Sequence, residues 1–374
     1  MARVNKVLIV GGGIGGLSLA SGLRNRGIEV ELVEVKKEWT VYGVGIIQQC
    51  NVIRAMAQLG LVDRILEAGF AYENMGLYTA AGELLRMLPG ARAAGPEYPA
   101  NLGISRLALH QVLSTTAVEK GTTIRLGLTV EHLEQDPDGV EVLFTDGTRG
   151  RYDLVVGADG LYSKVRSMVF GKELKPRFTG QSVFRHNFPR PPEVDHLVVC
   201  YGKNHNAGLC PLSKDLMYMF LTSSEPGNPR MPEDQLAELM RERLMEFGGL
   251  LGRLREQITD PKQVVYKPME VIFVPEPWYR GRVVLMGDAA HAMTPHLSQG
   301  AGMAVEDAVV LSELLAEVAP VEALLSRFMQ RRYERCKFIV ESSIQIGDWE
   351  MQGAPQTDRS ALVKKMMEVT AQPI

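Results

Sequence analysis

The stretch Val7-Leu8-Ile9-Val10-Gly11-Gly12-Gly13-Ile14-Gly15-Gly16 decides the fold of this chain. Its first four residues are apolar without alternation, which predicts a strand buried on both faces. The spacing Gly11-x-Gly13-x-x-Gly16 predicts a tight turn at Gly11, close approach of a pyrophosphate at Gly13 and packing of a helix on the strand at Gly16. We therefore predict strand, turn and helix, with Gly11, Gly13, Ile14 and Gly16 at a phosphate-binding site.

An acidic residue lies where such a turn requires one. The second predicted strand, residues 28–33, ends at Glu34, about 20 residues beyond the glycines, where a carboxylate accepts both hydroxyls of a ribose. The combination predicts a dinucleotide site, but it does not separate FAD from NAD. A plain NAD-dependent dehydrogenase therefore stays open at this point.

The composition limits the possible classes of protein. A length of 374 residues predicts two or three domains, since a domain usually holds roughly 100–200 residues. The 41 Lys and Arg against 44 Asp and Glu give a net charge of −3, which gives no support for binding nucleic acid or an anionic membrane. No apolar stretch approaches the ~20 residues of a membrane span. The four cysteines form no Cys-x-x-Cys pair, so we expect no metal site and a reducing, cytoplasmic location.

Two later apolar runs also end in glycine. They are residues 154–156 before Gly157 and residues 283–286 before Gly287. Ligands of parallel sheets bind at the carboxyl ends of the strands. We therefore expect backbone atoms at the ends of the three glycine-terminated runs to contact one shared ligand.

The middle and the end of the chain follow other patterns. Residues 122–149 predict short strands, and 182–187, 196–201 and 216–221 predict strands of a second, mostly antiparallel sheet, followed by helices over 232–258. An amphipathic helix is predicted from Ala304, with Glu306 off its apolar face. The basic residues Arg331, Arg332, Arg335 and Lys337 are expected on a solvated helix face.

The segments around the two later glycines carry a family resemblance. Residues 153–160 read Asp-Leu-Val-Val-Gly-Ala-Asp-Gly, and residues 282–291 read Arg-Val-Val-Leu-Met-Gly-Asp-Ala-Ala-His. In this order, after the N-terminal glycines, they resemble the DG and GD motifs of the single-component FAD-dependent aromatic hydroxylases, the group A flavoprotein monooxygenases. The resemblance runs from about Lys6 to Ser343 and is nearest to a salicylate-hydroxylase-like subgroup with the para-hydroxybenzoate-hydroxylase fold.

The resemblance implies a set of FAD-binding residues. Arg106 opens an R-x-x-L helix start, residues 43–47 resemble the loop beside the flavin ring, and the N-terminus of the helix at Gly300 is expected to stabilise the N1/C2=O edge of the ring. Two positions depart from the family: Gly302 replaces a frequent Asn, and Val35 a frequent Arg. Beyond the first motif, the expected cofactor-binding residues are Gly45, Ile46, Arg106, Val130, Asp159, Asp288, Pro295, Gly300, Ala301, Gly302 and Met303.

The resemblance also implies a reaction. NADH or NADPH, bound transiently, reduces FAD, and O₂ then gives a flavin C4a-hydroperoxide that hydroxylates a small electron-rich aromatic or N-heteroaromatic compound. We expect His296 to position or deprotonate the substrate, with Arg185 and Tyr218 as further catalytic candidates; His291 is assigned to motif structure. His186, Tyr201 and His205 are weaker candidates on the same predicted strands or turns. The expected protein is a monomer or homodimer.

Alternatives of the same fold remain. An epoxidase and a urate-type hydroxylase share all three motifs, and an FAD-binding redox sensor without turnover would carry them too. A plain NAD-dependent dehydrogenase would leave the two later motifs unexplained.

The implied fold is α/β: a Rossmann-like FAD-binding domain with a parallel sheet, interrupted by a mostly antiparallel-sheet substrate domain and followed by C-terminal helices. The expected boundaries are 1–72, 100–178 and 271–318 for the FAD-binding domain, 73–99 and 179–270 for the substrate domain, and 319–374 for the helical segment.

Overall fold

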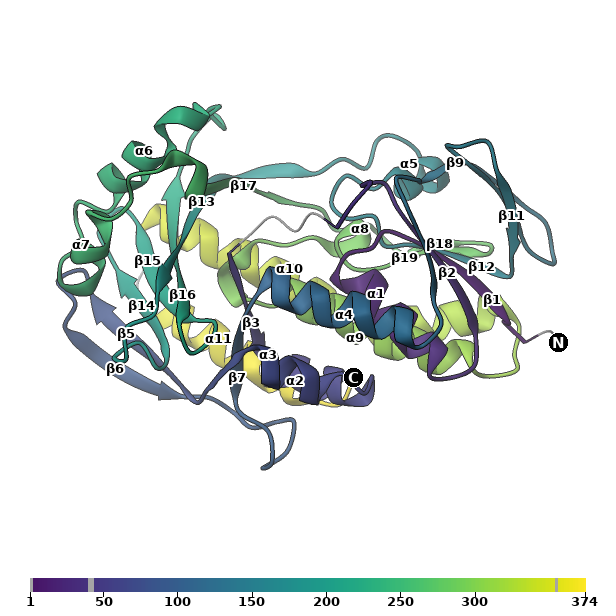
Figure 1. Cartoon of the computed structure of the whole chain (residues 1–374), viewed down its shortest axis with the longest axis horizontal. Helices are drawn as coiled ribbons and strands as arrows, with labels where there is room; N and C mark the ends of the chain where they lie inside the picture. Colours follow the sequence, from purple (N-terminus) through teal and green to yellow (C-terminus); the bar gives the residue numbers. More distant parts are fainter. Residues whose placement is uncertain (1–2, 40–43, 354–355) are drawn as a thin grey trace.

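A six-stranded sheet is the centre of one lobe of the computed structural model, which describes residues 3–39, 44–353 and 356–374 (Figure 1). The three glycine-terminated runs are neighbours in this sheet, as predicted, and pair in parallel. Only the pairing of the first two strands in the sheet order is antiparallel. That order is β18 (Tyr279–Arg280), β19 (Val283–Leu285), β12 (Leu154–Gly157), β1 (Lys6–Val10), β2 (Glu29–Glu34) and β8 (Thr123–Leu126).

The turn after β1 has the sterics that its glycines predict. Gly11 has φ +113°, and a Cβ there would lie 2.3 Å from the carbonyl oxygen of Ala158. A Cβ at Gly16 would lie 2.1 Å from the carbonyl oxygen of Gly11, so only glycine lets α1 (Ile14–Arg24) approach the strand this closely. The turn therefore brings β1, β12 and α1 together at the carboxyl end of the sheet.

A seven-stranded sheet forms the other lobe. All its pairings are antiparallel except that of β14 with β5. The predicted strands are present, but β15 was not predicted, because its sequence Asn-Ala-Gly-Leu-Cys-Pro is poor in β-forming residues. The order is β17 (Val265–Val271), β13 (Arg177–Pro189), β16 (Leu216–Ser224), β15 (Asn206–Pro211), β14 (Leu197–Tyr201), β5 (Asn74–Thr79) and β6 (Leu84–Pro89).

The two faces of this sheet have different neighbours. One face packs against α6 (Leu236–Arg243) and α7 (Gly249–Arg255) in a second apolar core that includes Phe184, Met219 and Leu221. The alternate residues of the same strands face the first lobe, because side chains of a strand alternate between faces. Two short 3₁₀ helices, Glu233–Gln235 and Pro261–Gln263, flank α6 and α7.

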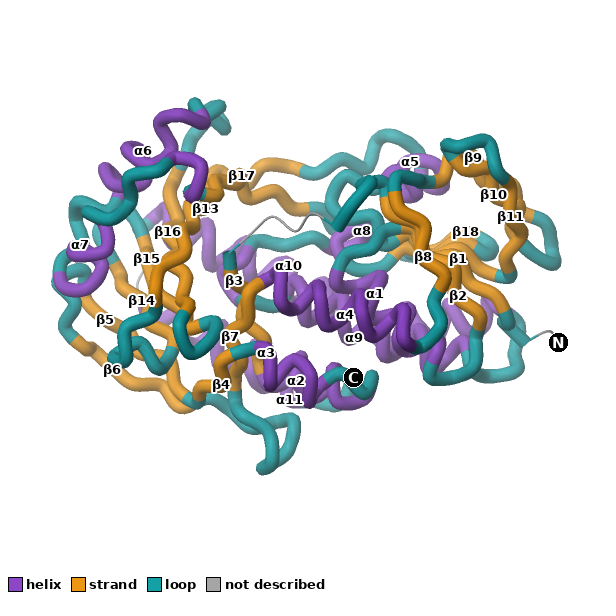
Figure 2. The backbone as a smooth tube through the Cα atoms, viewed as in Figure 1, coloured by secondary structure: helices purple, strands orange, loops and turns teal. Residues whose placement is uncertain are grey.

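Two small sheets complete the strands. One contains β3 (Gly45–Gln49), β7 (Asn101–Ser105) and β4 (Phe70–Tyr72), and the other β9 (Val130–Gln135), β10 (Val140–Phe144) and β11 (Arg149–Tyr152) (Figure 2). The segment expected to be a flavin-side loop is therefore a strand from Gly45 onward, since it pairs with β7; Gly43 lies outside the described residues.

Helices surround the first sheet and close one side of the space between the lobes. α1 packs between α9 (Gly300–Leu315) and α4 (Arg106–Glu119), and α10 (Val321–Gln352) crosses from one lobe to the other (Figure 1). The remaining helices are α2 (Cys50–Gln58), α3 (Val62–Ala68), α5 (Lys164–Phe170), α8 (Asp288–His291), α11 (Gln356–Ala371) and the 3₁₀ helix Pro295–Leu297. Among the described residues no helix is both long enough and apolar enough to cross a membrane.

Two expectations about these helices are wrong. α9 is buried almost all round rather than amphipathic, and Glu306 lies inside with no exposed side-chain surface. Arg332 is also fully buried, and Arg335 is 9% exposed, because both guanidinium groups pair with Glu306. Helical periodicity could not anticipate this, since α9 and α10 pack on each other through a layer of paired charges.

Candidate active site

A cavity of about 680 Å³ lies between the two lobes, within the roughly 300–1,000 Å³ range of cofactor and small-molecule sites. It begins at the glycine turn after β1 and continues past β3 and residues 293–300 to the face of the seven-stranded sheet. Residues of α10 and α11 also line it. One continuous space therefore joins the nucleotide-binding turn to the second lobe.

The turn end of the cavity has room and partners for phosphates and a ribose. No atom lies within 4 Å of where a Cβ of Gly13 would stand, and the N-terminus of α1 at Gly13 has no side-chain cap. Its free N–H groups favour an anion. The Glu34 carboxylate lines the cavity while accepting hydrogen bonds from the N–H groups of Gly12 at 2.9 Å and Lys36 at 3.0 Å. These bonds hold the carboxylate at the place predicted for ribose binding.

Two rings flank the same turn. Trp39 lies over Gly12, where an added Cβ would be 2.6 Å from the indole ring, and its centroid is 4.8 Å from that of His110. The Nε2 of His110 donates to the carbonyl oxygen of Gly12 at 3.0 Å. Burial lowers the pKa of His110, which keeps the ring neutral near pH 7. The turn therefore has an aromatic wall that its sequence motif did not indicate.

The α9 end of the cavity fits a flavin ring and its ribityl chain. Asp288 is exposed to the cavity and has no hydrogen-bond or ion-pair partner among the described residues, so its carboxylate is free to accept from hydroxyls. Gly300 and Ala301 place the positive end of a 16-residue helix at the cavity, beside Pro295. The residues present thus fit FAD at the dinucleotide turn, the ribityl position and the ring.

Two arginine side chains line the middle of the cavity, and neither is paired with an acidic side chain among the described residues. Arg106 at the start of α4 and Arg185 on β13 both line it, and neither guanidinium has a hydrogen-bond or ion-pair partner in the described part of the chain. Burial, and next the charge of Arg106, lower the pKa of Arg185 to about 10, so it remains a cation at neutral pH. Burial also raises the pKa of Tyr218, which stays a neutral hydrogen-bond donor. The arrangement is a receptor for negative charge.

His296 is held between two partners at the edge of the cavity. Its Nδ1 is 2.8 Å from Thr294 Oγ1, and its Nε2 is 3.3 Å from Glu350 Oε2 of α10. Burial opposes ionisation of Glu350, but the charge of His296 outweighs it and lowers the pKa of that carboxyl. The Nδ1 is therefore hydrogen-bonded within the protein, whereas the buried Nε2 lies at ion-pair distance from Glu350 without a hydrogen-bond partner among the described residues. His296 thus connects residues 294–300 with α10.

Most of the predicted site residues line the cavity. Among the described residues, those that do so are Gly13, Ile14, Glu34, Gly45, Ile46, Arg106, Arg185, Tyr218, Asp288, Pro295, His296, Gly300 and Ala301. Tyr201, a weaker candidate, lines it too, whereas His186 faces the opposite side of β13, with its ring 4.4 Å from that of Phe188. His205 is also absent from the lining.

Among the described residues, six of the predicted site residues do not line the cavity. Gly11 and Gly16 shape the turn, and Val130 is fully buried in the core. The Asp159 carboxylate accepts from the N–H groups of Lys164 at 2.7 Å and Val165 at 3.0 Å, so it binds the first turn of α5, whose N-cap is Ser163.

The last two of the six belong to the first turn of α9. A Cβ at Gly302 would meet Val52 at 2.8 Å rather than the cavity, and the N–H of Met303 already donates to the carbonyl oxygen of Gln299 at 2.9 Å. Position 302 therefore faces α2 rather than the cavity.

The C-terminal helices supply lining residues that sequence reasoning missed. They are Ile346, Glu350, Arg359, Val363, Met366 and Met367. No motif marks them, and an apolar residue in a helix is indistinguishable in sequence from a core residue.

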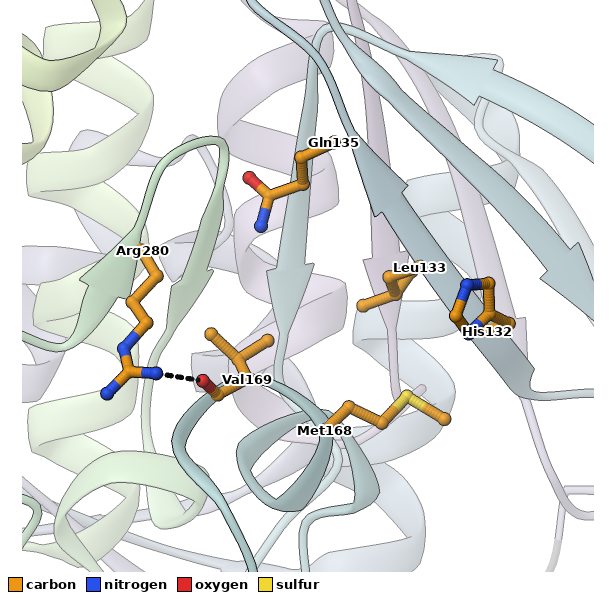
Figure 3. Close-up of a pocket in the computed structure, with 6 residues that line it drawn as sticks. All are labelled: His132, Leu133, Gln135, Met168, Val169 and Arg280. Carbon is orange, nitrogen blue, oxygen red and sulfur yellow. Dashed lines mark hydrogen bonds between the residues drawn. The ribbon is translucent and has the colours of Figure 1, made fainter.

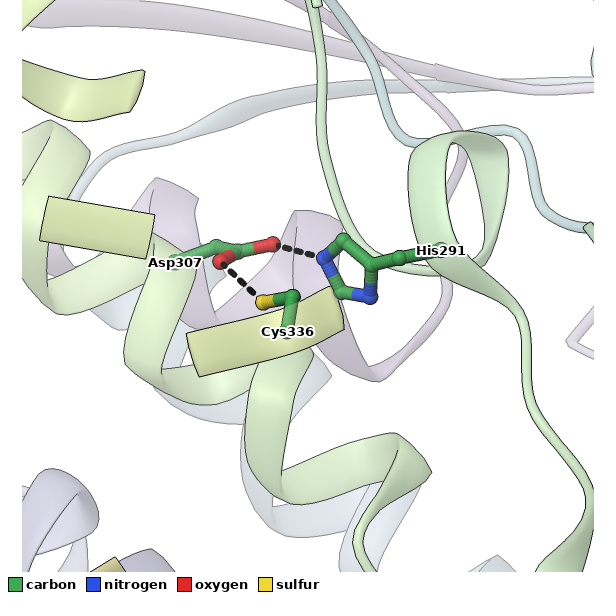
Figure 4. Close-up of side chains that lie close together, drawn as sticks. All are labelled: His291, Asp307 and Cys336. Carbon is green, nitrogen blue, oxygen red and sulfur yellow. Dashed lines mark hydrogen bonds and ion pairs between the residues drawn. The ribbon is translucent and has the colours of Figure 1, made fainter. Parts of the chain in front are cut away.

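A buried cluster behind the cavity resembles a metal site in residue type but not in charge. His291, Asp307 and Cys336 gather their polar atoms within 4.8 Å (Figure 4). The guanidinium of Arg332 already occupies the same place, with Nε 2.7 Å from Asp307 and Nη2 3.5 Å from Cys336. The anionic charge that would hold a cation is thus satisfied, and His291, bonded to Asp307 at 2.6 Å, has the structural role expected for it.

A second, smaller cavity of about 280 Å³ lies between β9, α5 and β18 (Figure 3). Arg280, its one guanidinium, is bonded to the carbonyl oxygen of Val169 at 2.9 Å. This cavity contains none of the predicted site residues among its lining.

Known proteins resemble this chain over nearly its whole length. The sequence model described as FAD binding domain matches residues 5–343. The chain is 34% identical to the aurachin C monooxygenase/isomerase of Stigmatella aurantiaca (92% of this chain, 90% of the relative) and 30% identical to the FAD-dependent urate hydroxylase of Klebsiella oxytoca (90% and 88%). Its structure matches Klebsiella pneumoniae HpxO complexed with FAD and uric acid, with a TM-score of 0.88, 25% identity and coverage of 99% of this chain and 97% of that one. The chain therefore belongs to the single-component FAD-dependent aromatic hydroxylases, the group A flavoprotein monooxygenases.

Proposed function

We propose that this FAD-dependent monooxygenase uses NADH or NADPH and O₂ to hydroxylate a small electron-rich aromatic or N-heteroaromatic compound that binds as an anion. The observation that carries the proposal is the pair of unpartnered guanidinium groups, Arg106 and Arg185, in a cavity that runs from the dinucleotide turn to the second lobe. A cavity with uncompensated positive charge favours ligands that bring negative charge.

The two arginines are suited to different ligands. Arg106 opens α4, which packs on α1 beside the glycine turn, so it is suited to the phosphate and ribityl part of FAD. Arg185 lies on the sheet of the other lobe beside Tyr218, so it is suited to the substrate. FAD, when bound, supplies the redox chemistry that activates O₂.

Arg185 and Tyr218 support activation of the ring without a dedicated base. A cation close to a phenolic or equivalent hydroxyl lowers the pKa of that hydroxyl, because it stabilises the ionised form. Tyr218 stays protonated and can donate a hydrogen bond to the same oxygen. The ionised ring is richer in electrons and therefore more reactive toward an electrophilic oxygen donor.

His296 and Glu350 support a positioning role in this scheme. Their 3.3 Å contact ties residues 294–300, which line the cavity beside the flavin position, to α10. The pair thereby fixes the distance between the flavin side and the sheet side of the cavity.

A urate-type hydroxylase is a second candidate within this proposal. The urate hydroxylase of Klebsiella oxytoca is 30% identical, and urate is an anionic N-heteroaromatic compound that meets the same charge requirement. We also propose a cytoplasmic location, supported by the four free cysteines, and a monomer or homodimer.

The test is a panel of phenols, hydroxybenzoates, hydroxypyridines and urate incubated with the FAD-loaded protein. Each compound is scored for consumption of NADH and of NADPH and for hydroxylated product by mass spectrometry. We expect at least one ionisable ring compound to accelerate reductant oxidation with product formed in step. Flavin that is bound but never reduced or reoxidised faster with any member of the panel would favour the redox sensor instead.

A further inference from the structure

The face of the seven-stranded sheet that lines the cavity can be mapped from its strand register. Residues directly opposite each other in paired strands point to the same face. Arg185 is opposite Phe220, Phe220 is opposite Gly208, and Gly208 is opposite Val199, so these positions form one row across β13, β16, β15 and β14. On the same face, Leu197 is two residues from Val199 and opposite Met75 of β5.

This row is longer than one aromatic ring. Neighbouring strands are about 4.8 Å apart, so the three steps from Arg185 to Val199 span about 14 Å. The glycine in the row accommodates its neighbour, since a Cβ at Gly208 would lie 2.3 Å from the ring of Phe220, which leans over that position. A ring bound at Arg185 therefore leaves the far end of the row uncovered.

The polarity of the sheet face changes along the row. Arg185 and Tyr218, on β13 and β16, carry the charge and the hydroxyl. The β14 and β5 end carries Leu197, Val199 and Met75, with the hydroxyl of Tyr201 further along β14 on the same face. All four line the cavity and are only partly buried.

The C-terminal helix adds further apolar side chains to the lining of the same cavity. Val363 and Met367 of α11 also line the cavity and are partly exposed. None of these side chains carries a charge, and each leaves apolar surface open to the cavity. Apolar surface of this kind is stabilised when a ligand removes it from water.

We infer that the cavity contains an apolar subsite for an alkyl substituent of the substrate, formed by Met75, Leu197, Val199 and Phe220 with Val363 and Met367. The inference rests on the proposed function, because the polar end of the row must hold the ring. The substrate class is then an ionisable aromatic or N-heteroaromatic ring that carries an alkyl chain of several carbons. The two methionines suit such a role, since an unbranched thioether side chain adapts to chains of different length.

The experiment measures the affinity of FAD-loaded protein for a series of hydroxypyridines with no chain or with n-alkyl chains from methyl to heptyl. Binding is read from the perturbation of flavin absorbance, and product formation is recorded for each member. We expect Kd to fall with each added methylene, by up to about fourfold per CH₂, until the subsite is full.

Two neighbouring valines provide a matched pair of variants. Val199 faces the cavity, whereas Val198 faces the second core, so the same change to threonine can be made on either side of one strand. Val199→Thr is expected to weaken binding of the heptyl compound by about threefold to tenfold and to leave the unsubstituted ring unchanged. Val198→Thr is expected to change neither affinity. Val199→Phe, which fills the subsite, is expected to shorten the chain length at which affinity is highest.

The outcomes separate the subsite from the proposed function. Hydroxylation of the unsubstituted ring without any gain in affinity from longer chains would overturn the subsite and leave the proposed function standing. An equal loss of affinity for the ring and the heptyl compound in Val199→Thr would overturn it as well. If no member of the series binds or reacts, while FAD is bound, it is the proposed function that fails.

Discussion

At the residue scale, the proposed chemistry depends on a few groups whose charge the cavity leaves uncompensated. Arg185 is the clearest of them, because it lies in a space without an anionic partner among the described residues and remains protonated although burial lowers its pKa to about 10. Tyr218 beside it remains neutral. Such a pair stabilises an anion much more than a neutral ring.

Replacing Arg185 with methionine tests this directly. Hydrogen bonds to charged groups contribute about 1.5–3 kcal/mol, so Arg185→Met is expected to weaken binding of an ionised ring substrate by roughly 10- to 150-fold. Binding of FAD should be retained, because Arg106 and the glycine turn are untouched. Titration of the flavin absorbance with substrate, alongside the FAD content of the purified variant, measures both. Arg185→Lys keeps the charge and should lose less, and equal losses in the two variants would point away from charge recognition.

His296 makes a different prediction, because its two nitrogens already face Thr294 and Glu350. His296→Ala removes the link between residues 294–300 and α10 and is expected to lower the hydroxylation rate by about tenfold while FAD stays bound. His296→Gln, which keeps a hydrogen-bonding side chain of similar reach, should recover much of that loss if the role is positioning. A rate and a substrate affinity unchanged in the alanine variant would remove His296 from the site.

At the scale of elements, α9 and α10 are joined by buried charges rather than by an apolar seam. Arg332 donates to Asp307 and Glu306 at 2.7 Å each, and Arg335 also binds Glu306. Burial raises the pKa of both carboxyls, but the facing cations outweigh it and hold each pKa below its usual range. Asp307 also accepts from the N–H of Gly287 at 3.0 Å, so this layer fixes the turn beneath the flavin position.

Removing one cation from this layer should be costly. Arg332→Met removes from two buried carboxylates a cation that they share, and breaking a buried pair in this way costs about 3–5 kcal/mol. The matched control is Arg327→Met on the same helix, because Arg327 pairs with Glu317 at the surface, where an ion pair contributes about 0–1 kcal/mol. Urea unfolding of the FAD-loaded proteins near pH 7 measures both free energies of unfolding.

The pH dependence of the same pair has a definite sign. In the wild type the lowered pKa values of Glu306 and Asp307 contribute stability above the unfolded values, near 4, which is lost as pH falls through the folded values. In Arg332→Met, one of the cations that oppose the effect of burial on Asp307 is missing, so the pKa of Asp307 rises. Protonation of Asp307 then removes part of the free-energy cost of burying its charge. The stability difference between wild type and variant should therefore shrink between about pH 7 and pH 5. A difference that grows on acidification would contradict this account.

At the scale of the whole molecule, the cavity is formed by both lobes and the C-terminal helices together. A ligand that binds only the folded chain stabilises it by about 2.7 kcal/mol when its free concentration is 100 times Kd. FAD should therefore raise the free energy of unfolding by this amount, and stripping it should lower the thermal midpoint. Thermal unfolding over a range of FAD concentrations measures the effect. Riboflavin, which lacks the pyrophosphate and adenosine, serves as the control, and equal stabilisation by riboflavin would argue against binding at the Gly13 turn.

The sequence by itself determined the nucleotide-binding half of the site. The steric requirements of Gly11 and Gly16 are local, and the apolar run before each of the three glycines is enough to specify a buried parallel strand. The order of the three motifs then identified the family, which the comparisons confirm. These features can be recognised in the sequence because the conformation of a turn or a strand depends on residues that are close together in the chain.

Only the tertiary structure decided the substrate half. The neighbours of Arg185 follow from the register of β13 and β16. The buried partners of Arg332 follow from the packing of α9 against α10. Val363 and Met367 line the cavity because α11 packs beside it. In sequence, Arg332 was indistinguishable from a solvated arginine and Met367 from a core methionine. The reason is physical: a side chain's charge or apolarity is a property of the residue, but whether it meets water, a partner or a ligand is set by residues far away in the chain.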